Sequence, residues 1–226
     1  MNVRTPLIIT ALVIGAMLAA SAWGWTAIPA HAQMAVHWDI HGRPNGYMPK
    51  TFGLLMLPCI TTILGAIFAI LPRIEPRRAH LLSSRKLYFA GWYGSLGVSG
   101  VTHLLMVMNA AGLHVDVERW VLCTIAIAFV VLGNYMGKSR SNFFVGVRLP
   151  WTLSSELAWD RGNRLAGFGL VITGIATLLA LAFVGSIAAI VVCAIGTIFS
   201  FILGGVASYL TWKRDAGRID GDSIHD

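Results

Sequence analysis

The feature that most constrains this chain is the length of its stretches without a charged side chain. Asp, Glu, Lys and Arg are absent from residues 5–38, 51–72, 87–115, 120–137 and 165–212, which are stretches of 34, 22, 29, 18 and 48 residues. A helix needs about 20 apolar residues to cross a bilayer. With 56% hydrophobic and only 12% charged residues, this pattern excludes a soluble enzyme, a disordered chain and a nucleic-acid-binding domain. We therefore expect an all-α, polytopic membrane protein.

The charge-free stretches predict about six transmembrane helices, because the longest stretch is broken near Gly185 into two. Lys and Arg are distributed unevenly over the resulting loops, with 14 on one side and 3 on the other. The positive-inside rule assigns the richer side to the cytoplasm. We therefore expect a multi-pass protein of the cytoplasmic (inner) membrane with both termini inside, and no direct nucleic-acid partner. The spans are placed at about 6–28, 52–72, 88–111, 119–136, 165–184 and 187–211.

We divide the chain into a two-helix region, residues 1–72, and a four-helix region, residues 73–226. The first contains an extracytoplasmic loop at 29–51, and the second a cytoplasmic loop at 137–164. A cleaved signal peptide ending at Ala32 is an alternative for the first span. A signal peptide has an apolar core of about 7–15 residues, and the run here is longer, so we favour an uncleaved helix.

The outer loop, residues 29–51, combines histidines with turn-forming residues. His37, Asp39 and His41 alternate, so an extended segment would place them on one side, where they could bind a transition metal. Gly42 and the Asn45-Gly46 pair instead favour a compact, hydrogen-bonded turn. We prefer the turn and assign no metal and no cofactor. The candidate ligand-binding residues of this loop are His37, Asp39, His41, Gly42, Pro44 and Lys50.

The spans themselves carry small residues and one titratable group. Glycines at 91, 94, 97 and 100 repeat every three residues, and small residues at 196, 200, 204 and 208 repeat every four. Such faces allow close helix packing in lipid; a glycine-lined conduit is the alternative. His103 is a functional candidate because ionisable groups are rare inside spans. A neutral histidine bonded across helices would look the same. Three cysteines in separate spans are interpreted as inert.

The inner loop, residues 137–164, is basic and aromatic. Lys138, Arg140 and Arg148 could face anionic headgroups, so membrane lipid is an expected partner. Ser154 is a candidate N-cap for a helix that begins near Ser155. The loop contains no nucleophile–base pair and no paired carboxylates, and we expect no enzymatic activity. The motif residues singled out here are Asn134, Asn142, Gly146, Arg148, Pro150, Trp151 and Thr152.

The inner-loop motif resembles the signature of the SdpI family. The similar segments are residues 133–135, 142–148 and 150–154, and residues 37–50 resemble the uncharacterised domain that commonly precedes that signature. The resemblance implies an immunity protein against a secreted sporulation-delaying toxin, with a toxin peptide as outer partner and a cytoplasmic repressor as inner partner. It departs at Leu149, where the family tends to have Thr, and at Asn163, where it tends to have His.

Two function classes follow from these features. The first is a non-enzymatic immunity or receptor-like protein that meets a toxin at the outer loop and signals inside. The second is a transporter of an ion or small solute, with a path near His103 and the glycine-rich third span.

Overall fold

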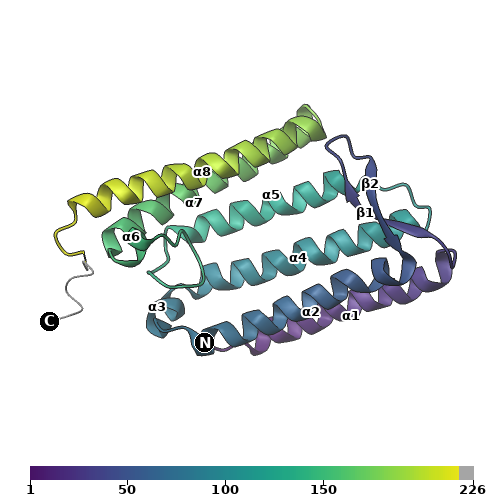
Figure 1. Ribbon diagram of the computed structural model, residues 1–226, viewed down its shortest axis with the longest axis horizontal. Coiled ribbons are helices and arrows are strands. Elements are labelled where there is room, and N and C mark those ends of the chain that lie inside the picture. Colours follow the sequence, from purple (N-terminus) through teal and green to yellow (C-terminus); the bar gives the residue numbers. More distant parts are fainter. Residues whose placement is uncertain (219–226) are drawn as a thin grey trace.

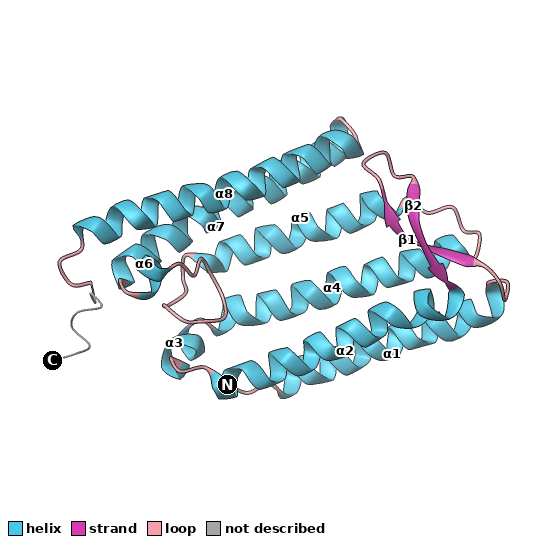
Figure 2. Cartoon of the chain, in the orientation of Figure 1, coloured by secondary structure: helices cyan, strands magenta, loops and turns pink. Residues whose placement is uncertain are grey.

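The protein is built from long helices, and the computed structural model describes residues 1–218 (Figures 1 and 2). Its elements are α1 (Arg4–Ala27), β1 (Gln33–Trp38), β2 (Pro44–Pro49), α2 (Lys50–Ile74), α3 (Arg78–Ser83), α4 (Arg85–Ala110), α5 (Val117–Met136), α6 (Pro150–Leu153), α7 (Glu156–Phe183) and α8 (Ser186–Arg214). The predicted all-α membrane fold is confirmed, with one small two-stranded sheet added to it.

Five helices in the described part of the chain, α1, α2, α5, α7 and α8, are long and apolar enough to cross a membrane. The sixth long helix, α4, has 26 residues but is less apolar, because it contains glycines, serines and His103. In Figure 1 it runs alongside α5 over a similar length and lies between that helix and the α1–α2 pair. The number of spans therefore stays a prediction, and α4 is the helix on which it depends.

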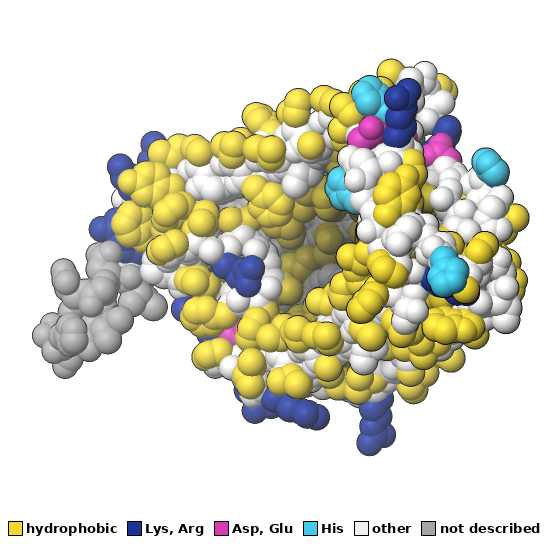
Figure 3. Space-filling model, turned by 45° about the vertical axis from the view of Figure 1, so that its right-hand side comes forward, with side chains coloured by type: hydrophobic (Ala, Val, Ile, Leu, Met, Phe, Trp, Pro, Cys, Tyr) yellow, Lys and Arg dark blue, Asp and Glu magenta, His cyan; other side chains and the backbone are white. Residues whose placement is uncertain are grey.

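The outward faces of the helices are apolar, as a lipid environment requires. Leu12 is 68% exposed, Phe168 63% and Phe183 82%. Figure 3 shows hydrophobic side chains over most of the face that it draws, with histidine and acidic side chains gathered mainly near the hairpin end.

Small residues bring α7 and α8 into close contact. A Cβ added at Gly204 would lie 2.7 Å from the Cβ of Ala166, and one at Gly196 would lie 2.5 Å from the hydroxyl oxygen of Thr173. The predicted close-packing face of the last span is confirmed. The reason is steric, since two helix backbones approach this closely only where side chains are small.

The glycine face of α4 packs less tightly than its spacing predicts. A Cβ added at Gly94 would lie 3.5 Å from Ala128, and one at Gly97 would lie 3.9 Å from Thr124. The neighbouring Phe89 and Tyr93 help to line an open groove of about 520 Å³ between α4 and α5. Small residues here leave an open groove between the two helices instead of bringing their backbones together.

The outer loop folds into a β-hairpin, which the sequence did not predict. β1 pairs antiparallel with β2, and the register shifts between Ala35 and His37. Met34 is fully buried with Leu54 and Val107 in one apolar cluster. This cluster fixes the hairpin to α2 and α4, so packing on the helices supplies the stability that an isolated hairpin lacks.

Candidate functional site

The two polar elements of the protein lie at opposite ends of the helices. The hairpin caps one end, and the 137–155 segment with α3 and α6 covers the other, where α1 begins and α8 ends (Figure 1). This arrangement fits the predicted topology, in which the two elements lie on opposite sides of the membrane.

The tip of the hairpin is organised by Asp39. Its Oδ1 accepts the backbone N–H of His41 at 2.8 Å and that of Arg43 at 2.9 Å. The hydrogen bond from Arg43 is the main reason that the pKa of Asp39 lies below its usual value, and the His41 bond adds to the shift. Gly42 completes the turn with a φ of 71°, a conformation that favours glycine. Asp39 and Gly42 therefore act in the turn itself.

The three alternating residues do not share an extended segment, because β1 ends at Trp38. His37 lies in the strand, and its Nδ1 pairs with the side-chain oxygen of Asn45 across the hairpin. His41 lies in the turn and is exposed. Across residues 1–218, no three His, Cys, Asp or Glu side chains form a group that could hold a metal ion. His41 remains a candidate contact residue, because it is exposed in the turn.

Lys50 is buried and holds the hairpin to α1. Its ammonium donates to the carbonyl oxygens of Trp25 at 2.7 Å and Ile28 at 2.6 Å. These carbonyls belong to the last turn of α1 and the residue after it, where acceptors lack helical partners. Only 8% of Lys50 is exposed, so its role in the outer loop is to stabilise the hairpin through buried hydrogen bonds. Pro44, by contrast, begins β2 and is exposed.

His103 lies in a polar contact between three helices and is fully buried. Its Nε2 is 2.9 Å from the hydroxyl of Ser21 and 3.1 Å from the carbonyl oxygen of Met17, both on α1. The Ser21 hydroxyl also donates to the carbonyl of Leu54 on α2. The geometry is that of a histidine bonded across helices. The Nδ1 atom has no partner among the described residues.

Buried side chains hold the backbone of the inner motif. Asn142 accepts the N–H groups of Phe144 and Val145 at 2.9 Å each, and its amide donates to the carbonyl of Arg140 at 2.8 Å. Asn163 of α7 accepts the N–H of Val147 at 2.7 Å. Each amide satisfies backbone groups that the irregular loop would otherwise leave unpaired.

The next turn of the motif is closed by Thr152. Its hydroxyl donates to the carbonyl of Val147 and accepts the N–H of Leu149, both at 2.8 Å. Pro150 begins α6, where a proline costs no hydrogen bond. Trp151 then donates its indole N–H to the hydroxyl of Ser208 at 2.9 Å and so joins the motif to α8.

Gly146 and Arg148 have different roles in this loop. Gly146 has a φ of 108°, and a Cβ there would lie 2.5 Å from Oδ1 of Asn163 and 3.0 Å from the Trp159 ring. Both constraints require glycine. Arg148 is exposed, and its guanidinium donates to the carbonyl of Phe143 at 2.8 Å. Asn134, the first motif residue, is exposed on α5 and contacts Lys138 at 3.4 Å.

Three residues of the 73–87 loop belong to this site and were missed by sequence reasoning, which counted this loop only for positive charge. Glu75 is 2% exposed and accepts the N–H of Phe143 at 3.2 Å. Arg77 donates to the hydroxyl of Ser141 and, at 2.9 Å, to the carbonyl of Leu153. One signal was present, since Glu75 is the single acidic residue between positions 40 and 115.

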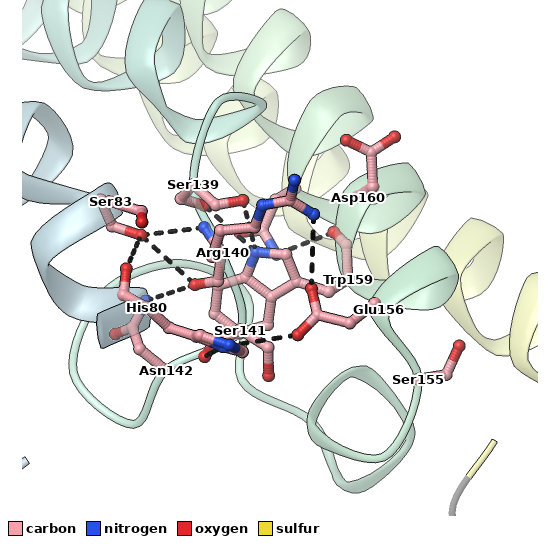
Figure 4. Close-up of polar contacts among 12 residues, drawn as sticks. His80, Ser83, Ser139, Arg140, Ser141, Asn142, Ser155, Glu156, Trp159 and Asp160 are labelled. Atoms are coloured by element: carbon pink, nitrogen blue, oxygen red, sulfur yellow. Dashed lines mark hydrogen bonds and ion pairs between the residues drawn. The ribbon is translucent and has the colours of Figure 1, made fainter. Parts of the chain in front are cut away.

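The third missed residue, His80, begins a charged cluster at the surface (Figure 4). Its Nδ1 lies 2.8 Å from the carbonyl oxygen of Ser141 and 3.5 Å from a carboxylate oxygen of Glu156. The other carboxylate oxygen of Glu156 lies 4.0 Å from the Arg140 guanidinium. Loop 73–87, the motif and α7 therefore meet at one exposed carboxylate. The cluster presents both signs of charge to the cytoplasmic side of the predicted topology.

The sequence predicted Ser154 as the N-cap of α7, but the N-cap is Ser155. The Ser155 hydroxyl accepts the N–H of Ala158 at 3.0 Å and donates to the carboxylate of Asp215 at 2.5 Å. The Ser155 bond is also the main reason that the pKa of Asp215 is lowered. The one-residue shift arises because α6 ends at Leu153 and Ser154 closes it, accepting no helix N–H of its own.

Comparison with known proteins identifies two family regions in this chain. The model of the SdpI/YfhL protein family matches residues 138–208, and that of a domain of unknown function, DUF1648, matches residues 12–62. The immunity protein SdpI of Bacillus subtilis (strain 168) is 21% identical over 182 residues, which are 80% of this chain and 84% of that protein. No solved structure matches. The two resemblances stated from the sequence are confirmed.

Proposed function

Because the chain carries an SdpI-family domain behind a DUF1648 region, we propose that it is a multi-pass membrane immunity protein that protects its cell against a secreted toxin peptide. The observation that carries this proposal is the place of the two regions in the fold. The DUF1648 region contains the hairpin, and the SdpI region contains most of the buried motif network at the other end.

We place the toxin contact on the hairpin. The exposed side chains there include Ile40, 57% exposed, Tyr47, 58% exposed, and His41. Together they offer apolar surface and a side chain whose charge changes near neutral pH. Asp39 and Lys50 hold this surface in place, because Oδ1 of Asp39 accepts two backbone N–H groups of the turn and the Lys50 ammonium donates to the end of α1.

At the inner end we propose a contact for a cytoplasmic regulator. The exposed Arg140, Arg148 and Glu156 supply charges of both signs on a loop that is held rigidly from below by Asn142 and Asn163. This role is non-enzymatic. It requires that the loop surface move together with α7 and α8. The hydrogen bond between Trp151 of the loop and Ser208 of α8 connects the two.

Protection can be measured in Bacillus subtilis cells that lack their own SdpI and are challenged with medium from toxin-producing cells. We expect the wild-type chain to restore growth and His41→Ala with Tyr47→Ala to lose at least about tenfold in protection, equivalent to 1.4 kcal/mol of binding. The matched control is Leu113→Ala with His114→Ala, which removes an exposed apolar side chain and an exposed histidine at the same end.

Membrane abundance of each variant is measured in parallel by immunoblotting. Full protection by a normally inserted His41/Tyr47 variant would contradict the assignment of the toxin contact to the hairpin. A wild-type chain that inserts but never protects would contradict the immunity role for this toxin. Solute flux in reconstituted vesicles that falls in His103→Ala, together with no protection, would favour the transporter alternative instead.

A further inference from the structure

A second polar site lies between the inner ends of α7 and α8. It is a pocket of about 370 Å³. Two side chains of α7 and four of α8 line its walls: Leu157, Arg161, Ala207, Leu210, Thr211 and Arg214. Asp215 forms its rim.

Helical spacing explains why these residues meet. Leu157 and Arg161 are four residues apart on α7, and the α8 residues are spaced by three or four, so each set forms one face of its helix. The helices come together beside the pocket, where a Cβ added at Gly162 would lie 2.7 Å from the Cβ of Ser208. The pocket is therefore a groove between two helices in contact.

The groove combines exposed apolar walls with unpaired cations. Leu157 is 61% exposed and Leu210 50% exposed. Within residues 1–218, the guanidinium groups of Arg161 and Arg214 have no hydrogen bond or ion pair, whereas Arg164 pairs with Asp160 at 3.3 Å.

The carboxylate on the rim does not neutralise these cations. Asp215 accepts the hydroxyl of Ser155 at 2.5 Å and the N–H of Gly217 at 2.9 Å. Two free guanidinium groups therefore outweigh one engaged carboxylate, and the groove has a net positive charge.

We propose that this groove binds an anionic glycerophospholipid of the inner leaflet. The phosphate lies between Arg161 and Arg214, and an acyl chain follows Ala207, Leu210 and the apolar flank of α8. A guanidinium suits a phosphate because its planar fork donates two parallel hydrogen bonds. A lipid fits better than a soluble phosphate because only a lipid also covers the exposed leucines. Basic pockets between helices on the cytoplasmic side have the chemistry that anionic headgroups require.

The test uses the full-length chain, purified in detergent and mixed with equal amounts of phosphatidylglycerol and phosphatidylcholine. Native mass spectrometry counts the lipids that stay bound. Each basic side chain near a membrane surface contributes about a fivefold preference for anionic lipid, so Arg161→Gln with Arg214→Gln should reduce the preference roughly thirtyfold. The matched control is Arg73→Gln with Arg78→Gln, which removes two exposed arginines from the same end of the helices.

The proposal requires that wild type and control prefer phosphatidylglycerol and that the double variant does not. An unchanged preference in the double variant, or an equal loss in the control, would overturn it. So would displacement of the lipid by millimolar glycerol phosphate, which would indicate a site for soluble phosphate. If the double variant elutes as aggregate, the two single variants are measured, and each must lose about fivefold; no loss in either would likewise overturn the proposal.

Discussion

Single buried amides carry the structure of the inner loop. Asn142 and Asn163 are fully buried, and both bond to backbone groups of an otherwise irregular segment. A buried N–H that loses its acceptor costs about 1–3 kcal/mol, whereas an exposed one returns to water. The importance of an amide in this motif therefore depends on its burial more than on its place in the signature.

We expect Asn163→Leu to lower the free energy of unfolding by about 1–3 kcal/mol, because the N–H of Val147 is left without an acceptor. Asn134→Leu is the matched control, since that side chain is exposed and accepts a 3.4 Å hydrogen bond from the Lys138 ammonium. Denaturant titrations in detergent, followed by tryptophan fluorescence, measure both. Equal stability of the two variants would contradict the role given to Asn163.

The hairpin is held against the helices by contacts at both its root and its tip. At the root, Lys50 bonds to the end of α1, and Met34 is buried against α2 and α4. At the tip, Gly42 lies against Glu118, because a Cβ there would be 2.7 Å from that carboxylate. The hairpin thereby connects the α1–α2 pair with the start of α5, and its turn depends on an ionised Asp39.

The turn should loosen in acid. The pKa of Asp39 is lower in the folded protein than its usual value of 3.8. The stabilisation is therefore complete above that value and is lost as the pH falls through the lowered pKa. Hydrogen exchange of the His41 and Arg43 amides should show protection that declines below about pH 4 in the wild type. Asp39→Asn keeps an acceptor without titrating, so parallel profiles for the two proteins would contradict this prediction.

The whole molecule is a layer of long helices with unlike ends. Most Lys and Arg residues belong to segments at the end formed by α3, α6 and the inner motif. The histidine-containing hairpin lies at the other end (Figure 1). The positive-inside rule then gives one orientation for every helix at once. The orientation also decides which proposed partner can reach which element.

Cysteine accessibility measures this orientation directly. In a background with the three native cysteines replaced by alanine, a membrane-impermeant maleimide should label Tyr47→Cys in intact cells and Ser83→Cys only after lysis. Both positions are exposed, and neither change alters the count of Lys and Arg. Labelling of Ser83→Cys but not Tyr47→Cys in intact cells would show that the orientation is the opposite of the predicted one.

The sequence by itself determined the features that depend on long uniform runs. The positions of the long helices, the membrane class and the contrast between the two ends follow from hydropathy and charge, which act through the solvent and not through particular neighbours. The Gly196–Ser208 spacing likewise predicted the close α7–α8 contact, because steric fit needs only small residues in register. The family motif could be found for the same reason, since it is a continuous segment.

The tertiary structure alone decided which polar groups meet across the chain. The hairpin was hidden because a register shift after Ala35 breaks the alternation that would identify a strand. Glu75, Arg77 and His80 join the inner motif from more than fifty residues away, and no local pattern relates them to Ser141 or Phe143. The sequence predicted Lys50 as an exposed ligand-binding residue, but in the structure its ammonium donates to carbonyl oxygens at the end of α1. For the inner motif and for Lys50, the deciding interaction is a hydrogen bond between distant segments, whose geometry exists only after the helices have packed.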